Sequence, residues 1–285
     1  MQRVLPTGVT CAYDRTGPIG APVVVLLHGL SGSRETYAAV IDNLTREYGA
    51  RLQVLNVDLR GHGDSSHQPL DGYDAHGYAA DVAALLSDLG LGQVLVVGHS
   101  LGGVVAAYLA VHRRAPVSSV FLEDPPLFEG DDARRAASPV AAFFPHLIAA
   151  VRKLQADNAP LSAYEALAAT HAPVEEIAER ARSLRRWDPT TMQAAVDGIV
   201  WQVFDPLAAI ACPVTILRAD PAVGAVFEPR DARAFMSVNP DARIHLVPGA
   251  SHSIHALPTR PVYLAHLRNA IDEFLGHRLA PSSPL

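Results

Sequence analysis

Short apolar runs alternate along the chain with longer amphipathic segments, and this alternation predicts the secondary structure. Runs of valine, isoleucine and leucine without polar alternation are typical of parallel strands that are covered on both faces. Strands are predicted near residues 9–14, 23–28, 52–58, 94–98, 117–123, 213–218 and 243–248, and helices near 34–48, 75–89, 101–113, 230–238 and 261–276. This order predicts an α/β fold with a mostly parallel central sheet and helices on both faces.

The alternation stops between about residues 125 and 205, where strand signals disappear. Only helical segments are predicted there, at residues 140–156, 163–170 and 174–186. Because strands resume near residue 213, this stretch is an insertion between two strands of one sheet. We therefore expect one core, built from residues 1–125 and 205–285, and a helical insertion formed by residues 126–204.

One predicted strand-to-helix junction carries a nucleophile pattern. Gly98-His99-Ser100-Leu101-Gly102 has the G-x-S-x-G spacing of a nucleophile elbow. The glycines permit a tight turn that exposes the serine hydroxyl above the carboxyl edge of the sheet, and the N-terminus of the next helix favours negative charge there. The pattern predicts Ser100 as a nucleophile, with a purely structural strand–turn–helix as the alternative.

A nucleophilic serine needs a general base, and His252 is the first candidate among the 13 histidines. It follows a predicted strand and a Pro-Gly turn, in a loop that reaches the ligand crevice of an open α/β sheet. His255, three residues later, is the alternative. His99 is expected to point away from the serine and to pack. The histidines show no H-E-x-x-H spacing, so no metal site is predicted.

Two backbone N–H groups are predicted to bind the oxyanion that forms in acyl transfer. The strand at residues 23–28 ends in His28-Gly29, and the loop after it commonly supplies one N–H, here that of Leu30. The residue after the nucleophile supplies the second, here Leu101. Each donor of this kind is worth about 3 kcal/mol of transition-state stabilisation.

Together these features resemble the α/β-hydrolase family. The segment Asp58-Leu59-Arg60-Gly61-His62-Gly63-Asp64-Ser65 is similar to the family's D-x-R-G-x-G-x-S loop, and Cys212-Pro213-Val214-Thr215-Ile216-Leu217 is similar to the strand after its lid. The resemblance covers roughly residues 20–125 and 205–278 and implies the family's fold with a helical cap over the active site. Ser100 argues against family members that use an aspartate nucleophile, such as haloalkane dehalogenases and epoxide hydrolases.

The acid of the triad is where this chain departs from the family pattern. The family usually places an aspartate in a G-x-x-D loop after the strand at residues 214–217. The matching position here is Ala222, and Asp220 lies two residues earlier. The loop therefore lacks the usual acid, and a second location has to be considered.

Some members of the family carry the acid at the end of the strand that follows the nucleophile helix. Here that strand ends in Glu123-Asp124, and adjacent strand residues face opposite sides of a sheet. Asp124, which lies 24 residues after Ser100, is favoured as the partner of His252. Asp220 is the second candidate and Glu123 the third, and a turn role for Asp124 before two prolines is the non-catalytic alternative.

The predicted cap would exclude water and shape the substrate pocket. Trp187 is the first choice for substrate contact, because it lies at a boundary between cap helices, directly after the basic run 182–186. The arginines of that run are expected to form a solvated helix face. The other candidates to line the pocket are large apolar residues: Phe143, Phe144, Leu147, Met192, Val196, Val200, Trp201 and Phe204.

Composition and charge argue against several other functions. The 285 residues are 49% hydrophobic with a net charge of −6, which fits a globular core and argues against nucleic-acid binding. No apolar run approaches the roughly 18 residues of a membrane span, and the N-terminus lacks a signal-peptide pattern. Cys11 and Cys212 are expected to be buried free thiols, with a disulfide as the alternative. We expect a cytoplasmic protein without nucleic-acid or membrane partners; the sequence does not indicate its oligomeric state.

The sequence thus predicts a serine hydrolase that needs no metal or organic cofactor. Its expected substrate is a small to medium hydrophobic ester or lactone, cleaved through an acyl-enzyme, and the cap and the early acid also resemble lactone hydrolases of the same family. C–C bond hydrolysis or perhydrolysis by the same residues is one alternative. A ligand-binding protein that retains the fold is another, favoured by the missing G-x-x-D aspartate.

Overall fold

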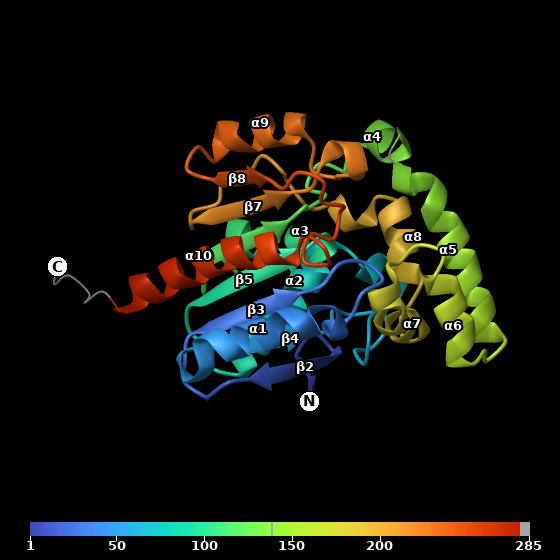
Figure 1. Cartoon of the computed structure of the whole chain (residues 1–285), viewed down its shortest axis with the longest axis horizontal. Helices are drawn as coiled ribbons and strands as arrows, with labels where there is room; N and C mark the ends of the chain where they lie inside the picture. Colours follow the sequence, from blue (N-terminus) through green and yellow to red (C-terminus); the bar gives the residue numbers. More distant parts are fainter. Residues whose placement is uncertain (138, 280–285) are drawn as a thin grey trace.

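The computed structural model describes residues 1–137 and 139–279 and confirms the predicted α/β architecture. Over these residues, eight strands form one sheet in the order β1-β2-β4-β3-β5-β6-β7-β8 (Figure 1). Pairings β1–β2 and β2–β4 are antiparallel, and all other neighbours are parallel. The strands are β1 (Gln2–Val4), β2 (Thr10–Thr16), β3 (Val23–Leu27), β4 (Gln53–Val57), β5 (Val94–His99), β6 (Val117–Glu123), β7 (Val214–Arg218) and β8 (Arg243–Leu246).

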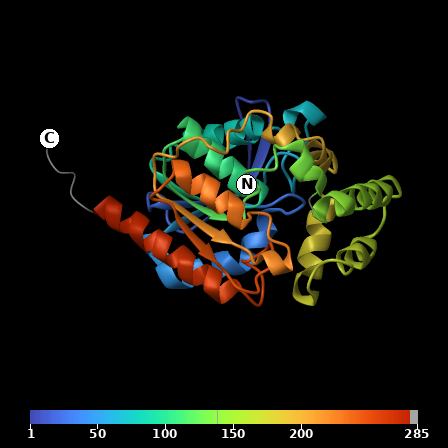
Figure 2. The same cartoon turned by 90° about the horizontal axis from the view of Figure 1, so that it is seen from above.

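The central strands are covered on both faces, as their composition predicts. Every residue of β3, β4 and β5 is buried, and successive side chains enter two different apolar cores. One core joins the sheet to α2 (Ala75–Asp88), α3 (Leu101–His112) and α9 (Pro229–Val238). The other joins it to α1 (Ala38–Tyr48) and α10 (Arg260–Leu279). The sheet therefore lies between two helical layers (Figure 2).

Between β6 and β7 the described chain forms only helices and turns. These helices are α4 (Asp132–Ala137), α5 (Pro139–Ala156), α6 (Leu161–Ala168), α7 (Ile177–Arg185) and α8 (Thr190–Val196), and Figure 1 shows them gathered beyond one end of the strands. They enclose an apolar cluster of their own, which contains Val151, Leu184 and Trp187. Other residues of the same stretch, such as Leu127, Ala194 and Trp201, pack in the core of the sheet, so the bounds of 126–204 stay a prediction.

One short strand and two short helices were not predicted from the sequence. β1, α4 and α8 span too few residues to show a clear hydrophobic period. The predicted helix at residues 34–48 also begins as a 3-10 turn before α1. The 3-10 helices are Arg34–Tyr37, Gly49–Arg51, Leu70–Gly72, Val174–Glu176, Ile199–Trp201 and Pro221–Val223.

The strand order reverses between β3 and β5. The chain passes from β3 to β4 on one side and then crosses to β5 on the other. At such a switch point the loops after the two strands diverge and leave a crevice, which is where α/β sheets bind ligands. The loop after β3 carries Leu30 and the turn after β5 carries Ser100, so the fold brings these two predicted segments together.

Both cysteines are free, as predicted, although only Cys11 is buried and Cys212 is partly exposed. None of the helices in the described ranges combines the length and the apolar composition that crossing a membrane would require.

Candidate active site

Ser100 occupies a strained turn between β5 and α3. Its φ is 52° and its ψ −116°, a region that residues other than glycine rarely adopt. The flanking glycines are required by close contacts: a Cβ on Gly98 would lie 2.2 Å from the carbonyl oxygen of Gly102, and one on Gly102 would lie 2.0 Å from that of Leu27. This geometry is the one expected of a nucleophile elbow.

His252 contacts Asp124, the acid that the sequence favoured. The Nδ1 atom of His252 lies 2.7 Å from Oδ2 of Asp124. The same carboxylate accepts hydrogen bonds from the backbone N–H groups of Ala219, Val226 and Phe227. Because an ionised carboxylate only accepts hydrogen bonds, Nδ1 of His252 is the donor, and its Nε2 is left as a proton acceptor.

Asp220, the second candidate acid, contacts backbone groups instead of His252. Its oxygens accept hydrogen bonds from the N–H of Gly249 at 2.8 Å and from that of Ala222 at 2.9 Å. These two bonds lower the pKa of the carboxyl group. Asp220 therefore braces the loops after β7 and β8, and it does not approach the imidazole.

Glu123, the third candidate, forms a second carboxylate–histidine pair behind the first. Its oxygens lie 2.9 and 2.8 Å from Nδ1 of His255, and the backbone N–H of His255 donates to Oε1 at 2.7 Å. Both side chains are buried. Burial disfavours the charged imidazole, but the charge and hydrogen bond of Glu123 outweigh it and raise the pKa of His255.

His99 lies between the two histidines. Its ring centre is 4.7 Å from that of His252 and 4.9 Å from that of His255. Burial and the two neighbouring imidazoles hold the pKa of His99 well below its usual range, so the ring is neutral. Its Nε2 lies 3.1 Å from the backbone oxygen of His252 and donates to it. The sequence predicted only packing here, whereas the structure shows that His99 also holds the His252 loop.

His99, Glu123 and His255 also have the spacing of metal ligands. One ligand atom of each lies within 4.8 Å of the others, and all three side chains are buried. The oxygens of Glu123 are already engaged by His255. A metal ion would have to compete with that pair for the same oxygens.

The loop after β3 is held by the buried side chain of His28. Its Nε2 accepts a hydrogen bond from the N–H of Leu59, so its Nδ1 donates to the oxygen of Gly29. Its own carbonyl oxygen accepts from the N–H of Gly102 at 3.1 Å. Complete burial lowers the pKa of His28 to about 4, which keeps the required neutral ring at neutral pH. The loop that carries Leu30 is thereby fixed against the start of α3.

A cavity of about 620 Å³ opens at Ser100, within the size range of small-molecule sites. His252, Leu30 and Leu101 line it together with Ser100, so four of the predicted site residues face one space. The inserted helices supply mostly apolar walls. The predicted cap residues found in the lining are Phe143, Phe144, Met192, Val196, Val200 and Trp201.

The structure does not place Trp187 in this cavity, contrary to expectation. Its side chain is fully buried in the apolar cluster of the inserted helices, and its Nε1 donates to Oγ1 of Thr191 at 2.6 Å. The boundary between α7 and α8 faces the interior of the helical group, so a residue there packs between helices. Leu147 and Phe204, also expected in the pocket, lie outside its described lining.

Arg180 and His171 line the cavity, and the sequence analysis did not single them out. Arg180 precedes the buried Leu184 by four residues on α7, and residues with this spacing share a helix face. That spacing could have indicated that Arg180 lies on the inward face of its helix, although Leu184 itself packs among the inserted helices and does not line the cavity. The sequence instead predicted a solvated face for the neighbouring arginines at residues 182–186.

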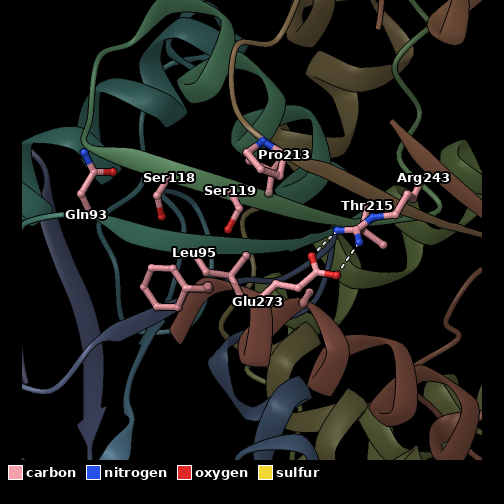
Figure 3. A pocket seen from close by; sticks show the side chains of 11 residues that line it. Gln93, Leu95, Ser118, Ser119, Pro213, Thr215, Arg243 and Glu273 are labelled. Atoms are coloured by element: carbon pink, nitrogen blue, oxygen red, sulfur yellow. Dashed lines mark hydrogen bonds and ion pairs between the residues drawn. The ribbon is translucent and has the colours of Figure 1, made fainter. Parts of the chain in front are cut away.

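A second hollow, of about 360 Å³, lies at the opposite end of the central strands (Figure 3). Residues near the beginnings of β5, β6 and β7, such as Leu95, Ser118 and Thr215, line it. Figure 3 shows Arg243 and Glu273 facing each other there, and they form an ion pair at 2.5 Å. None of the predicted site residues faces this hollow, so the candidate site is the cavity at the carboxyl end of the sheet.

Comparisons with known proteins are consistent with this architecture. The model of the Alpha/beta hydrolase family matches residues 24–265. The chain is 27% identical over 252 residues to N-formylmaleamate deformylase of Pseudomonas putida, covering 88% of this chain and 89% of that protein. A crystal structure of E-2-(acetamidomethylene)succinate hydrolase aligns with a TM-score of 0.72 at 24% identity, covering 95% and 99% of the two chains; this likeness concerns the fold.

A shorter match is closer in sequence. Over 108 residues the chain is 39% identical to the sn-1-specific diacylglycerol lipase ABHD11 of Mus musculus, covering 38% of this chain and 34% of that protein. The chain spans less than half the length of the first curated relatives it matches.

Proposed function

The chain belongs to the Alpha/beta hydrolase family, a family of hydrolytic enzymes, and we propose that it cleaves a carboxylic ester or lactone through Ser100. The observation that carries this proposal is the contact of Asp124 with His252 at the cavity that Ser100 lines. Relatives named as a diacylglycerol lipase and as a bifunctional esterase/perhydrolase support cleavage of an ester bond.

In the proposed reaction, Nε2 of His252 accepts the proton of Ser100 Oγ as this oxygen attacks the carbonyl carbon. Asp124 fixes the tautomer of His252 and stabilises the imidazolium that forms. The N–H groups of Leu30 and Leu101 bind the oxyanion of the tetrahedral intermediate.

Collapse of that intermediate completes the first half of the reaction. The C–O bond to the leaving alcohol breaks, and the alcohol takes the proton from His252. Water, deprotonated by His252, then attacks the acyl group on Ser100. A second tetrahedral intermediate collapses to release the carboxylic acid and return the proton to the serine.

The shape of the cavity favours a small to medium substrate. Its volume of about 620 Å³ and its largely apolar walls suit an ester or lactone with a hydrophobic part. Side chains of the inserted helices, among them Phe144 and Met192, form part of the wall, which is consistent with a cap that excludes water.

The alternative of a non-catalytic binding protein depended on the missing aspartate in the loop after β7. A carboxylate from a different loop, that of Asp124 after β6, contacts His252 instead. The observation that favoured the alternative therefore no longer supports it.

The test is hydrolysis of p-nitrophenyl acetate, butyrate and octanoate and of simple lactones by wild type and Ser100→Ala. Ser100→Ala is expected to lose at least about a thousandfold in kcat, as loss of a triad nucleophile does. Ser118→Ala is the matched control, because it makes the same change at the opposite hollow and should retain the rate. Equal rates in wild type and Ser100→Ala would exclude Ser100 as the nucleophile.

A further inference from the structure

We propose that the substrate of this site carries a carboxylate and that Arg180 of α7 binds it. This inference rests on the proposed hydrolase function and specifies its substrate class.

Arg180 is placed next to the predicted reaction centre. It lines the same cavity as Ser100 and His252, and its Nη1 lies 3.3 Å from both the backbone oxygen and Oγ of Ser31. Ser31 directly follows Leu30, the predicted oxyanion donor. A carboxylate held by Arg180 would therefore lie only a few bonds from the scissile carbonyl, as in a half-ester of a short dicarboxylic acid.

The other charged side chains of the cavity lining already have partners. Arg135 forms an ion pair with Asp132 at 2.6 Å, and Glu129 forms one with Arg134 at 2.9 Å. Arg180 is the arginine of the described lining that has no carboxylate of the described chain within 4.0 Å. Its positive charge is thus available to a ligand.

The hydrogen bonds of Arg180 also leave donors unused. A guanidinium has five N–H donors in a fork that fits a carboxylate, and among the described residues Arg180 donates only from Nη1, toward Ser31. Burial raises the pKa of Glu176 overall, and the positive charge of Arg180 lowers it in part. No ion pair between Glu176 and Arg180 within 4.0 Å is present in the described structure.

His171 provides a second polar group in the same cavity. Oγ1 of Thr170 donates to the oxygen of Leu167, so it cannot also donate to Nδ1 of His171, which lies 3.2 Å away and must carry the proton. Nε2 of His171 is buried and has no hydrogen-bond partner among the described residues. Burial and the charge of Arg180 lower the pKa of His171. A carboxylate beside Arg180 would offset that charge and let Nε2 take up a proton and donate to the ligand.

The remaining walls define the rest of the substrate. Phe143, Phe144 and Trp201 present apolar surface to the cavity. The expected substrate is therefore an ester with one anionic end near Arg180 and an apolar remainder. A neutral ester of the same size would leave the Arg180 charge without a counter-ion.

The test follows phenol release from phenyl hydrogen glutarate and from phenyl methyl glutarate, in which a methyl ester replaces the carboxylate. The succinate and adipate pairs cover other lengths. Wild type should show a kcat/KM about tenfold to a hundredfold higher for the anionic member of the best pair, the worth of one charge-assisted hydrogen bond. Arg180→Gln should abolish this preference. Arg185→Gln, an exposed arginine on the same helix, should keep it. The ratio of the two esters cancels any general loss of activity.

The outcomes separate this inference from the proposed function. Cleavage of both members of every pair at equal rates, or an unchanged preference in Arg180→Gln, would overturn the inference and leave the hydrolase function intact. If no ester is cleaved, the proposed function fails for these esters. The role of Arg180 is then tested by measuring the binding of dicarboxylates. Calorimetric binding of succinate, glutarate or adipate that Arg180→Gln weakens and Arg185→Gln retains would support it, and no binding to wild type would overturn it.

Discussion

Two carboxylate–histidine pairs lie back to back at the end of β6. Asp124 contacts His252, and Glu123, one residue earlier, contacts His255. Glu123 is the last residue of β6, whereas Asp124 follows the strand with a φ of 39°, and both carboxylates are fully buried. The histidines differ, because 32% of the His252 side chain is exposed and only 8% of the His255 side chain.

This difference shows that access, and not side-chain chemistry, separates the two pairs. His252 lines the cavity that also holds Ser100. His255 packs between the rings of Tyr37 and Tyr263, at 5.4 and 6.0 Å between ring centres. The first imidazole lines the cavity, and the second is absent from its described lining. We therefore expect the first pair to serve the reaction and the second to stabilise the fold.

Among changes at the two pairs, the largest effect on the rate is expected from Asp124→Asn. An amide nitrogen at this position cannot accept the Nδ1 proton of His252, so the wrong tautomer is favoured and kcat should fall by about 10³-fold to 10⁴-fold. The measurement is kcat on p-nitrophenyl butyrate, with circular dichroism to verify folding. Glu123→Gln is the matched control, with a much smaller loss of rate. A rate near that of wild type in Asp124→Asn would mean that the two pairs do not differ in function.

The next effect is on stability, and it concerns the second pair. Glu123→Gln leaves His255 buried without its counter-ion, and removing one partner of a buried ion pair costs about 3–5 kcal/mol of unfolding free energy. The pKa of His255 is raised in the folded protein. Its stabilisation is therefore fully present below the ordinary histidine value of 6.5 and is lost as pH rises through the folded pKa.

Urea unfolding of wild type and Glu123→Gln at several pH values measures this effect. The difference in unfolding free energy should be largest on the acidic side of neutrality and shrink as pH rises. Buried histidines without contacts to this pair, such as His28, are present in both proteins and cancel in the difference. A difference that grows with pH would contradict the assignment of His255 as a charged structural partner.

The comparison of the two pairs also shows what the sequence can predict. The strands β3 and β5 could be predicted because an unbroken apolar run is a local signal, and the elbow at Ser100 because its glycine spacing is local. Asp124 could be favoured from its offset after Ser100 and from strand alternation. Sequence alone could not choose between Asp124 and Asp220, because β6 and β7 are parallel neighbours. The loops after both strands therefore begin at the same edge of the sheet.

The insertion shows where such prediction fails. Arg180 lies on α7 and Trp187 follows the end of that helix by two residues, yet Trp187 packs among the inserted helices and Arg180 faces the cavity. Which side of a helix meets the cavity depends on how the inserted helices pack on one another and on the sheet. That packing joins residues distant in sequence, such as Arg180 and Ser31, and leaves no local pattern.

The smallest effect is expected from Asp220→Asn. Asp220 belongs to neither carboxylate–histidine pair, so this change tests whether a carboxylate outside the two pairs supports the reaction. The carboxylate of Asp220 holds backbone N–H groups of its own loop and of Gly249, three residues before His252, so its loss reaches the imidazole only through the loop. We expect kcat to change by about threefold or less, the scale of an exposed substitution away from the reacting groups. The assay is that used for Asp124→Asn, run in parallel. A loss of about a thousandfold would mean that the catalytic acid is Asp220, in the loop after β7. The contact of Asp124 with His252 would then have a structural role only, like that of Glu123 with His255.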